Sequence, residues 1–149
     1  MNRSAWALTM ILLSACAAQP SVHQSSGALP LAISQLTYQT DPATGQVDIN
    51  LTIKSEYREP LKTVRVEVAA YDANGQKLSA SDESIEVLGP IVRGQSIGPL
   101  DKVIGIQNAT VACIEVVRVQ IVKLDYTLDS VWGKEAQGLV SGGHPQCHK

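Results

Sequence analysis

Alternation of apolar and polar residues is the feature that most constrains what this chain can fold into. From residue 47 to residue 54 the sequence reads VDINLTIK, in which every apolar side chain is followed by a polar one. Residues 64–70, VRVEVAA, repeat the pattern. Successive side chains of a β-strand point to opposite faces of its sheet, so each run predicts a strand with one buried face.

Shorter runs of the same kind predict the remaining strands. Segments enriched in Val and Ile predict strands around residues 33–38, 84–88, 109–124 and 130–132. Asn74-Gly75 is a strong hairpin signal, and we expect residues 76–80 to return beside the strand that precedes the turn.

The spacing of these segments predicts the fold class. No stretch shows a helical pattern of any length. Seven or eight short strands in one domain predict an all-β fold, a single immunoglobulin-like β-sandwich. The pairs Gly89-Pro90, Arg93-Gly94 and Gly98-Pro99 predict a loop region between the later strands.

One hairpin carries a family resemblance. The alternating run that leads into Tyr71-Asp72-Ala73-Asn74-Gly75 resembles the central hairpin of small bacterial immunoglobulin-like domains of the FxLYD type, in which Tyr-Asp-x-x-Gly follows an alternating strand. The later residues 93–96, RGQS, resemble a loop of that family in which Gly precedes a polar pair. The Phe-x-Leu-Tyr-Asp signature itself is missing, because the chain has no Phe. The resemblance implies a non-catalytic domain that mediates contacts.

The start of the chain has the layout of a signal peptide. Arg3 precedes an apolar stretch over residues 5–13, which is too short to span a bilayer as a helix. The residues that follow resemble the lipobox of bacterial lipoproteins, Leu13-Ser14-Ala15-Cys16. That resemblance implies cleavage before Cys16 and a diacylglyceryl group on its sulfur. The alternative is an ordinary secretory signal with an incidental Cys16.

The lipobox resemblance also implies a location. In Gram-negative lipoproteins an Asp after the lipidated cysteine retains the protein in the inner membrane, whereas this chain has Ala17. We therefore expect a lipid anchor in the outer membrane, with the protein facing the periplasm. Two or three acyl chains at ~0.8 kcal/mol per buried methylene hold a protein on the membrane durably.

These features divide the precursor into four parts. Residues 1–15 form the signal peptide, and residues 16–30, rich in Ser, Ala, Gln, Gly and Pro, form the lipidated N-terminus and a flexible tether. Residues 31–135 form the sandwich, and residues 136–149 form a C-terminal tail. His23 lies in the tether and is expected to be solvated.

The two cysteines that remain are expected to be paired. An even number of cysteines in an exported domain favours a disulfide, here Cys113–Cys147. The bridge would tie the tail back to the domain and contribute about 3–4 kcal/mol in the chain-entropy model. The alternative is two free thiols.

Charge and residue types favour binding over catalysis. The formal net charge is −2 and there is no basic run, so a nucleic-acid partner has no electrostatic support. The three histidines, His23, His144 and His148, lie outside the expected sandwich. We interpret Glu56, Glu59 and Asp82-Glu83 as solvated loop charges. We therefore expect no enzyme activity and no cofactor.

The tail and one loop hold the remaining candidate sites. His144, Cys147 and His148 are competent metal ligands, but we expect no metal site because a bridged sulfur is not a thiolate. The best candidates for partner contact are Tyr57 and Arg58, since both residue types are enriched in binding hot spots.

Two functions remain open for such a chain. The favoured hypothesis is a tethered module that binds an envelope protein. The alternative is an inhibitor, or a lipoprotein that sequesters a ligand or metal, with Tyr57-Arg58-Glu59 as its protruding loop. Trp132 is expected to pack in the core or at the edge of the last strand.

Overall fold

The computed structural model describes residues 23–24, 29–41, 43–78, 83–105, 110–141 and 147. The expected signal peptide and Cys16 lie outside the described residues, as do Asp82, His144 and His148. The described elements are β1 (His23–Gln24), β2 (Leu31–Asp41), β3 (Gln46–Ser55), β4 (Leu61–Tyr71), β5 (Glu83–Ile91), β6 (Ser96–Gly105), β7 (Cys113–Lys123), β8 (Leu128–Trp132) and α1 (Lys134–Gln137).

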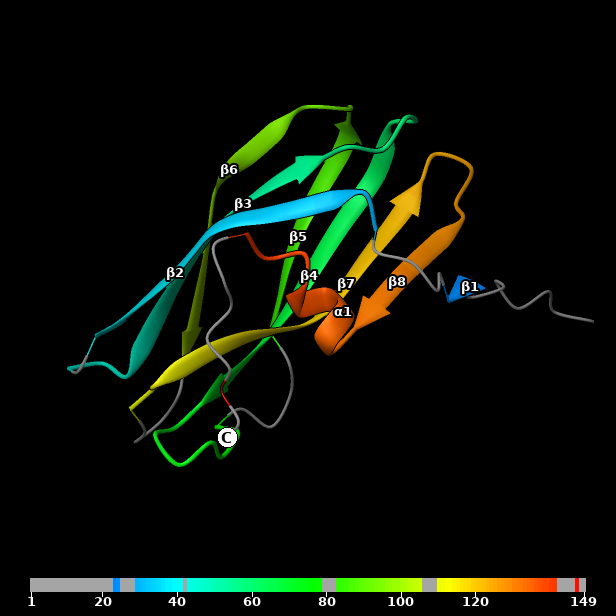
Figure 1. The fold of residues 1–149 in the computed structure, drawn as a ribbon. Helices are drawn as coiled ribbons and strands as arrows, with labels where there is room; N and C mark the ends of the chain where they lie inside the picture. The colour runs from blue at the N-terminus through cyan, green and yellow to red at the C-terminus, as the bar shows by residue number, and fades with distance from the viewer. Residues whose placement is uncertain are drawn as a thin grey trace, which may run out of the picture.

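The strands form two antiparallel sheets, which confirms the all-β sandwich (Figure 1). One sheet has the order β2-β3-β6 and the other has the order β8-β7-β4-β5. After β3 the chain crosses to the second sheet, where β4 and β5 pair. It then returns to the first sheet, where β6 pairs with β3, and crosses again so that β7 pairs with β4, as in an immunoglobulin-like sandwich. The two residues of β1 add a short parallel pairing at the edge of β8.

The alternating runs build the core as expected. In β3 the four apolar residues of the first run are fully buried, namely Val47, Ile49, Leu51 and Ile53. The inward residues of β4 are buried as well, and both sets belong to one hydrophobic cluster between the sheets. Burial at about 25 cal/mol per Å² of apolar surface makes this interface the main source of stability.

A bulge in β2 explains why its apolar spacing is irregular. The pairing with β3 shifts between Ser34 and Thr37, and Gln35 has a φ of +56°. The extra residue lets both Ile33 and Leu36 pack against the core although they are three positions apart.

The expected loop region across residues 89–99 is wrong in part, because much of it is strand. Gly89-Pro90 lies within β5, and Gly98-Pro99 lies within β6, which the sequence did not predict. Both pairs stand where the register shifts opposite the neighbouring strand, so each is a bulge. β5 and β6 are also edge strands, where a Pro without an N–H is tolerated.

The Asn-Gly turn is confirmed, and the segment after it returns beside the end of β4 as expected, but over the described residues the pairing is short. Asp72 Oδ1 accepts hydrogen bonds from the backbone N–H of Asn74 at 2.9 Å and of Gln76 at 2.8 Å. Beyond the turn only an isolated bridge joins Lys77 to Tyr71. The antiparallel neighbour of β4 on this side is β5.

The C-terminal segment is bound to the domain at three places. Ala136 of α1 and Leu139 are buried in the core. The backbone of residues 139–141 then runs beside the edge of β2, where the Ile33 N–H donates to the Leu139 carbonyl at 2.8 Å. The expected disulfide Cys113–Cys147 is present, with an S–S distance of 2.04 Å. At the other terminus, Leu29, near the end of the expected tether, also belongs to the core.

Candidate functional site

Strand ends place several loops at one end of the sandwich. Leu61, the first residue of β4, is paired with Lys123 at the end of β7 and with Ile91 at the end of β5. In the other sheet, Leu31 at the start of β2 is paired with Ser55 at the end of β3. The loops that connect these strands therefore all lie at this end, the upper end in Figure 1.

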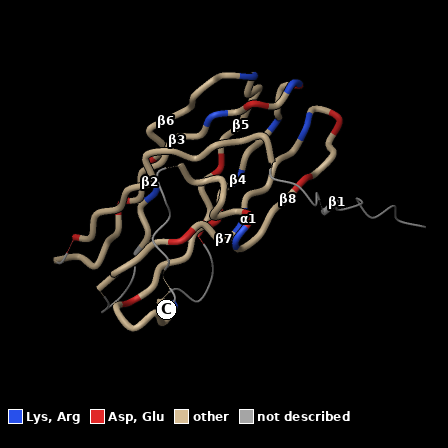
Figure 2. The backbone as a smooth tube through the Cα atoms, in the orientation of Figure 1, with Lys and Arg blue, Asp and Glu red and all other residues tan. Residues whose placement is uncertain are grey.

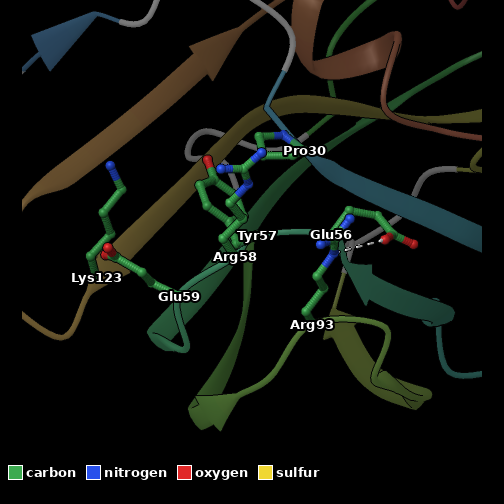
Figure 3. A pocket seen from close by; sticks show the side chains of 7 residues that line it. All are labelled: Pro30, Glu56, Tyr57, Arg58, Glu59, Arg93 and Lys123. Atoms are coloured by element: carbon green, nitrogen blue, oxygen red, sulfur yellow. Dashed lines mark ion pairs between the residues drawn. The ribbon is translucent and has the colours of Figure 1, made fainter.

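A cleft of about 440 Å³ opens at this end, which we call the cleft end (Figure 3). Its lining comes from the chain just before β2, from the β3–β4 and β5–β6 loops, and from the last residue of β7. The lining residues are Pro30, Glu56, Tyr57, Arg58, Glu59, Arg93 and Lys123. The two residues predicted to contact a partner, Tyr57 and Arg58, thus lie side by side in the lining of this cleft.

Backbone hydrogen bonds hold the walls of the cleft together. The Glu56 N–H donates to the Pro30 carbonyl at 2.9 Å, and the Gly94 N–H donates to the Ser55 carbonyl at 2.6 Å. These bonds join the β3–β4 loop to the segment before β2 on one side and to the β5–β6 loop on the other. Hydrogen bonds within the domain therefore hold the main chain on both sides of the β3–β4 loop.

Tyr57 brings a buried polar atom to the cleft. Its side chain is half-buried and packs against the core, and its hydroxyl group is buried without a hydrogen-bond partner among the described residues. Burial raises the pKa of this phenol, and the charge of Asp129 raises it further. The hydroxyl group therefore stays protonated at physiological pH and acts as a hydrogen-bond donor.

Most charges at the cleft are already paired. Glu56 lies between Lys54, at 2.7 Å, and Arg93, at 4.0 Å. The hydrogen bond from Lys54, with the charges of Lys54 and Arg93, holds the pKa of the Glu56 carboxyl below its usual value. Lys123 lies 2.9 Å from the Asp129 carboxylate.

Arg58 and Glu59 are the exceptions to this pairing. Both are exposed, and neither has a hydrogen bond or an ion pair with any residue that the structure describes. One cation with its full set of donors and one carboxylate thus remain available to a ligand.

Exposed apolar side chains surround the cleft end. Leu124 and Tyr126 lie in the β7–β8 loop with exposed fractions of 54% and 70%, and Val92 follows β5 with 47%. Leu88 of β5 is 76% exposed and is paired with Thr63, close to the start of β4. Several exposed apolar side chains near one end of a domain are a feature of interaction sites.

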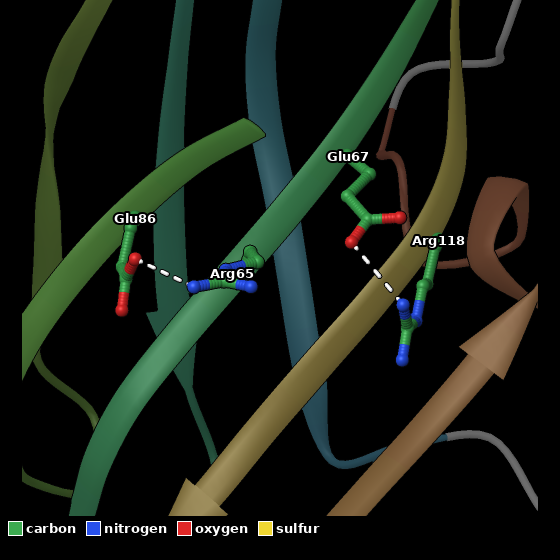
Figure 4. Close-up of polar contacts among 4 residues, drawn as sticks. All are labelled: Arg65, Glu67, Glu86 and Arg118. Carbon is green, nitrogen blue, oxygen red and sulfur yellow. Dashed lines mark hydrogen bonds and ion pairs between the residues drawn. The ribbon is translucent and has the colours of Figure 1, made fainter. Parts of the chain in front are cut away.

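The outer face of the four-stranded sheet is less available. Arg65 is paired with Glu86 at 2.9 Å, and Glu67 with Arg118 at 3.3 Å (Figure 4). The Arg118 guanidinium also lies 4.1 Å from the centre of the Trp132 ring, so Trp132 packs at the edge strand and not in the core. Its side chain remains 49% exposed.

Glu83, another carboxylate noted in the sequence, does not join the cleft. Glu83 is paired with Val68 in the register, toward the opposite end of β4, and lies 3.8 Å from the Lys102 amine. The sequence missed one buried carboxylate, Glu115 on β7, which accepts a hydrogen bond from the Gln137 side chain. The one-turn helix α1 covers this part of β7, and a four-residue helix leaves no periodic signal in a sequence.

One of the three potential metal ligands of the tail, Cys147, is described by the structure. Cys147 is bonded to Cys113, so its sulfur is not a free thiolate ligand. His144 and His148 lie outside the described residues.

Charges of both signs are interspersed over the sheets, as Figure 2 shows. Among the described residues, no helix has the length and hydropathy that a membrane span requires. No protein-family model, curated protein or solved structure matches this chain.

Proposed function

We propose that this protein is a lipid-anchored lipoprotein of the periplasm whose sandwich is a non-catalytic interaction module. The lipobox resemblance at Leu13 to Cys16 supports the anchor, and Ala17 supports an outer-membrane location. The module binds an envelope protein through the cleft end, so that the tether keeps the complex close to the membrane.

One observation carries the proposal. The cleft end combines Arg58, unpaired among the described residues, with the half-buried Tyr57, and exposed apolar side chains lie nearby on two loops and on β5. Arg and Tyr are the residue types that are enriched in interaction hot spots. Among the described residues, the lining contains no histidine, cysteine or serine.

The inhibitor alternative is less well supported. A compact inhibitor of a hydrolase is expected to present a protruding loop, whereas the ring of Tyr57 packs against the core. The loop of Tyr57, Arg58 and Glu59 therefore forms the wall of a cleft.

Crosslinking in intact cells, followed by capture from solubilised envelopes, tests the proposal with a matched pair of variants. Leu124 and Val103 are 54% and 53% exposed, but Leu124 lies at the cleft end and Val103 on β6. We expect Leu124→Ser to lower recovery of the partner at least about fivefold, as for a hot-spot residue, and Val103→Ser to leave it unchanged. Equal recovery with both variants would place the interface elsewhere.

Labelling and fractionation of the same cells test the lipid anchor. Wild-type protein should incorporate radiolabelled palmitate and sediment with membranes. A Cys16→Ala variant should be unlabelled and appear in the soluble fraction. Equal membrane retention of this variant would contradict lipid anchoring at Cys16.

A further inference from the structure

We propose that the cleft at Tyr57, Arg58 and Glu59 binds a carboxylate group carried by a peptide segment of the partner. This inference rests on the proposed function and specifies the chemistry that the cleft end recognises.

The donors of the cleft define the charge of the ligand. Arg93 and Lys123 face the carboxylates of Glu56 and Asp129, so their charges are largely neutralised within the chain. Arg58 alone keeps an unpaired guanidinium, whose fork of N–H groups fits the two oxygens of a carboxylate. The unpaired groups of the lining are thus one guanidinium, Arg58, and one carboxylate, Glu59, and the guanidinium is the group that a ligand carboxylate would bind.

The buried hydroxyl group of Tyr57 is a second, independent indication of a ligand. A buried polar atom without a partner is unfavourable, and nearly all such atoms in folded proteins have one. Tyr57 and Arg58 line the same cleft, as Figure 3 shows. The hydroxyl is covered in this structure, so a carboxylate held by Arg58 accepts a hydrogen bond from Tyr57 once a side chain over the hydroxyl moves aside.

The acceptors of the cleft favour a carboxylate over a phosphate group. Glu59 is unpaired and lies next to Arg58, so a dianionic phosphate would face a carboxylate as well as the single cation. The whole chain has a formal net charge of −2, which opposes binding to anionic lipid surfaces. A peptide places an N–H donor close to its carboxylate, and Glu59 can accept a hydrogen bond from that donor.

The surroundings of the cleft favour a peptide over a small carboxylic acid. Exposed side chains of Val92, Leu124 and Tyr126 flank the cleft on adjacent loops. A small acid would leave them in water, whereas a peptide of several residues with apolar side chains covers them. The hydrogen-bonded backbone of the cleft reduces the entropy lost on binding.

Four short peptides test the inference by titration of the purified chain, followed through its backbone amide NMR signals. N-acetyl-Leu-Leu as the free acid is compared with its C-terminal amide. N-acetyl-Leu-Glu-Leu-amide is compared with the peptide in which Gln replaces Glu. The first pair detects a terminal carboxylate and the second pair detects a side-chain carboxylate.

We expect at least one acid of the two pairs to shift the signals of residues 57–59 and to bind about tenfold more tightly than its neutral counterpart. Arg58→Gln should remove this difference in affinity. Tyr57→Phe should weaken binding of the acidic peptide by about twofold to tenfold without lowering the melting temperature of the protein. Lys134→Gln is the matched control, because it removes an exposed cation in α1, away from the cleft.

The outcomes separate this inference from the proposed function. Acid and neutral peptides that bind equally, or that leave residues 57–59 unshifted at about 10 mM, overturn the carboxylate inference. Tighter binding of inorganic phosphate than of either acid overturns it as well. If the Leu124→Ser variant still loses the captured partner in those cases, the proposed function stands and only the ligand chemistry is wrong.

Discussion

Glu56 connects two walls of the cleft through its ion pairs. Lys54 at 2.7 Å and Arg93 at 4.0 Å stabilise its ionised form, so the pKa of its carboxyl lies below the usual value of 4.5. A carboxyl whose pKa is lowered on folding stabilises the protein above its unfolded pKa, and this contribution is lost as the pH falls through the folded pKa.

Replacing Glu56 by Gln therefore has an effect that depends on pH. We expect Glu56→Gln to lower the free energy of unfolding slightly at pH 7, because the residue is exposed and its ion pairs are screened. The difference from wild type should be smaller at about pH 3, because the ion pairs are lost as the pH falls through the folded pKa. Urea unfolding at the two pH values measures it, and an equal difference at both would rule out the ion pairs as its cause.

Gly98 shows how the bulge in β6 depends on one residue. It has a φ of +151°, and a Cβ added there would lie 2.5 Å from Thr52 Oγ1 and 2.8 Å from Thr52 Cα. Gly94 also has a positive φ, +77°, but a Cβ added there would meet no atom within 4 Å. The two glycines thus separate the cost of backbone conformation from the cost of crowding.

The expected costs of the two alanine substitutions differ accordingly. Gly94→Ala should lower the free energy of unfolding by about 1–2 kcal/mol, from the positive φ alone. Gly98→Ala should cost a further ~1–3 kcal/mol, because the backbone of β3 must move away. Urea unfolding of both variants checks this, and equal costs would show that the bulge accommodates the added methyl group.

The strands that alternate strictly could be predicted from the sequence, and β6 could not. The run from Val47 to Ile53 has its apolar side chains fully buried, as its period requires. The Gly-Pro pair within β6 is a residue pair typical of loops. It is part of a strand because β6 pairs with β3 at the edge of the sheet, and this pairing is not visible in the local sequence.

The candidate site was predictable in its residue types but not in its geometry. Tyr57 and Arg58 stand out in the sequence as hot-spot residues. Lys123 ends β7 and Arg93 lies in the β5–β6 loop, and nothing in their local sequence indicates that they line one cleft with Glu56. Burial of the Tyr57 hydroxyl depends on side-chain packing, which cannot be predicted from a single sequence.

The disulfide and the cleft stand at opposite ends of the molecule. Cys113 is opposite Tyr71 in the register of β4 and β7, whereas Lys123 is opposite Leu61. Since the bridge spans 34 residues, replacing both cysteines by alanine should lower the free energy of unfolding by about 3–4 kcal/mol. Residues 57–59 should keep their NMR shifts wherever the variant is folded.

Chemical denaturation of the double variant measures the stability, and alkylation before mass analysis checks the pairing in the wild type. No thiol of Cys113 or Cys147 should react in the native, non-reduced protein. Two reactive thiols, or an unfolding free energy equal to that of the wild type, would contradict the role of the bridge.

The attachment of the C-terminal segment beside β2 has a mechanical consequence. A pull on the chain before Leu29 enters the domain at the first residues of β2, where Ile33 is hydrogen-bonded to the segment at Leu139 and Ser141 as well as paired with β3. Peeling β2 away therefore requires bonds on both of its edges to break together. The bracing segment is itself closed into a covalent loop by Cys113–Cys147, so tension is shared with β7 at the centre of the other sheet.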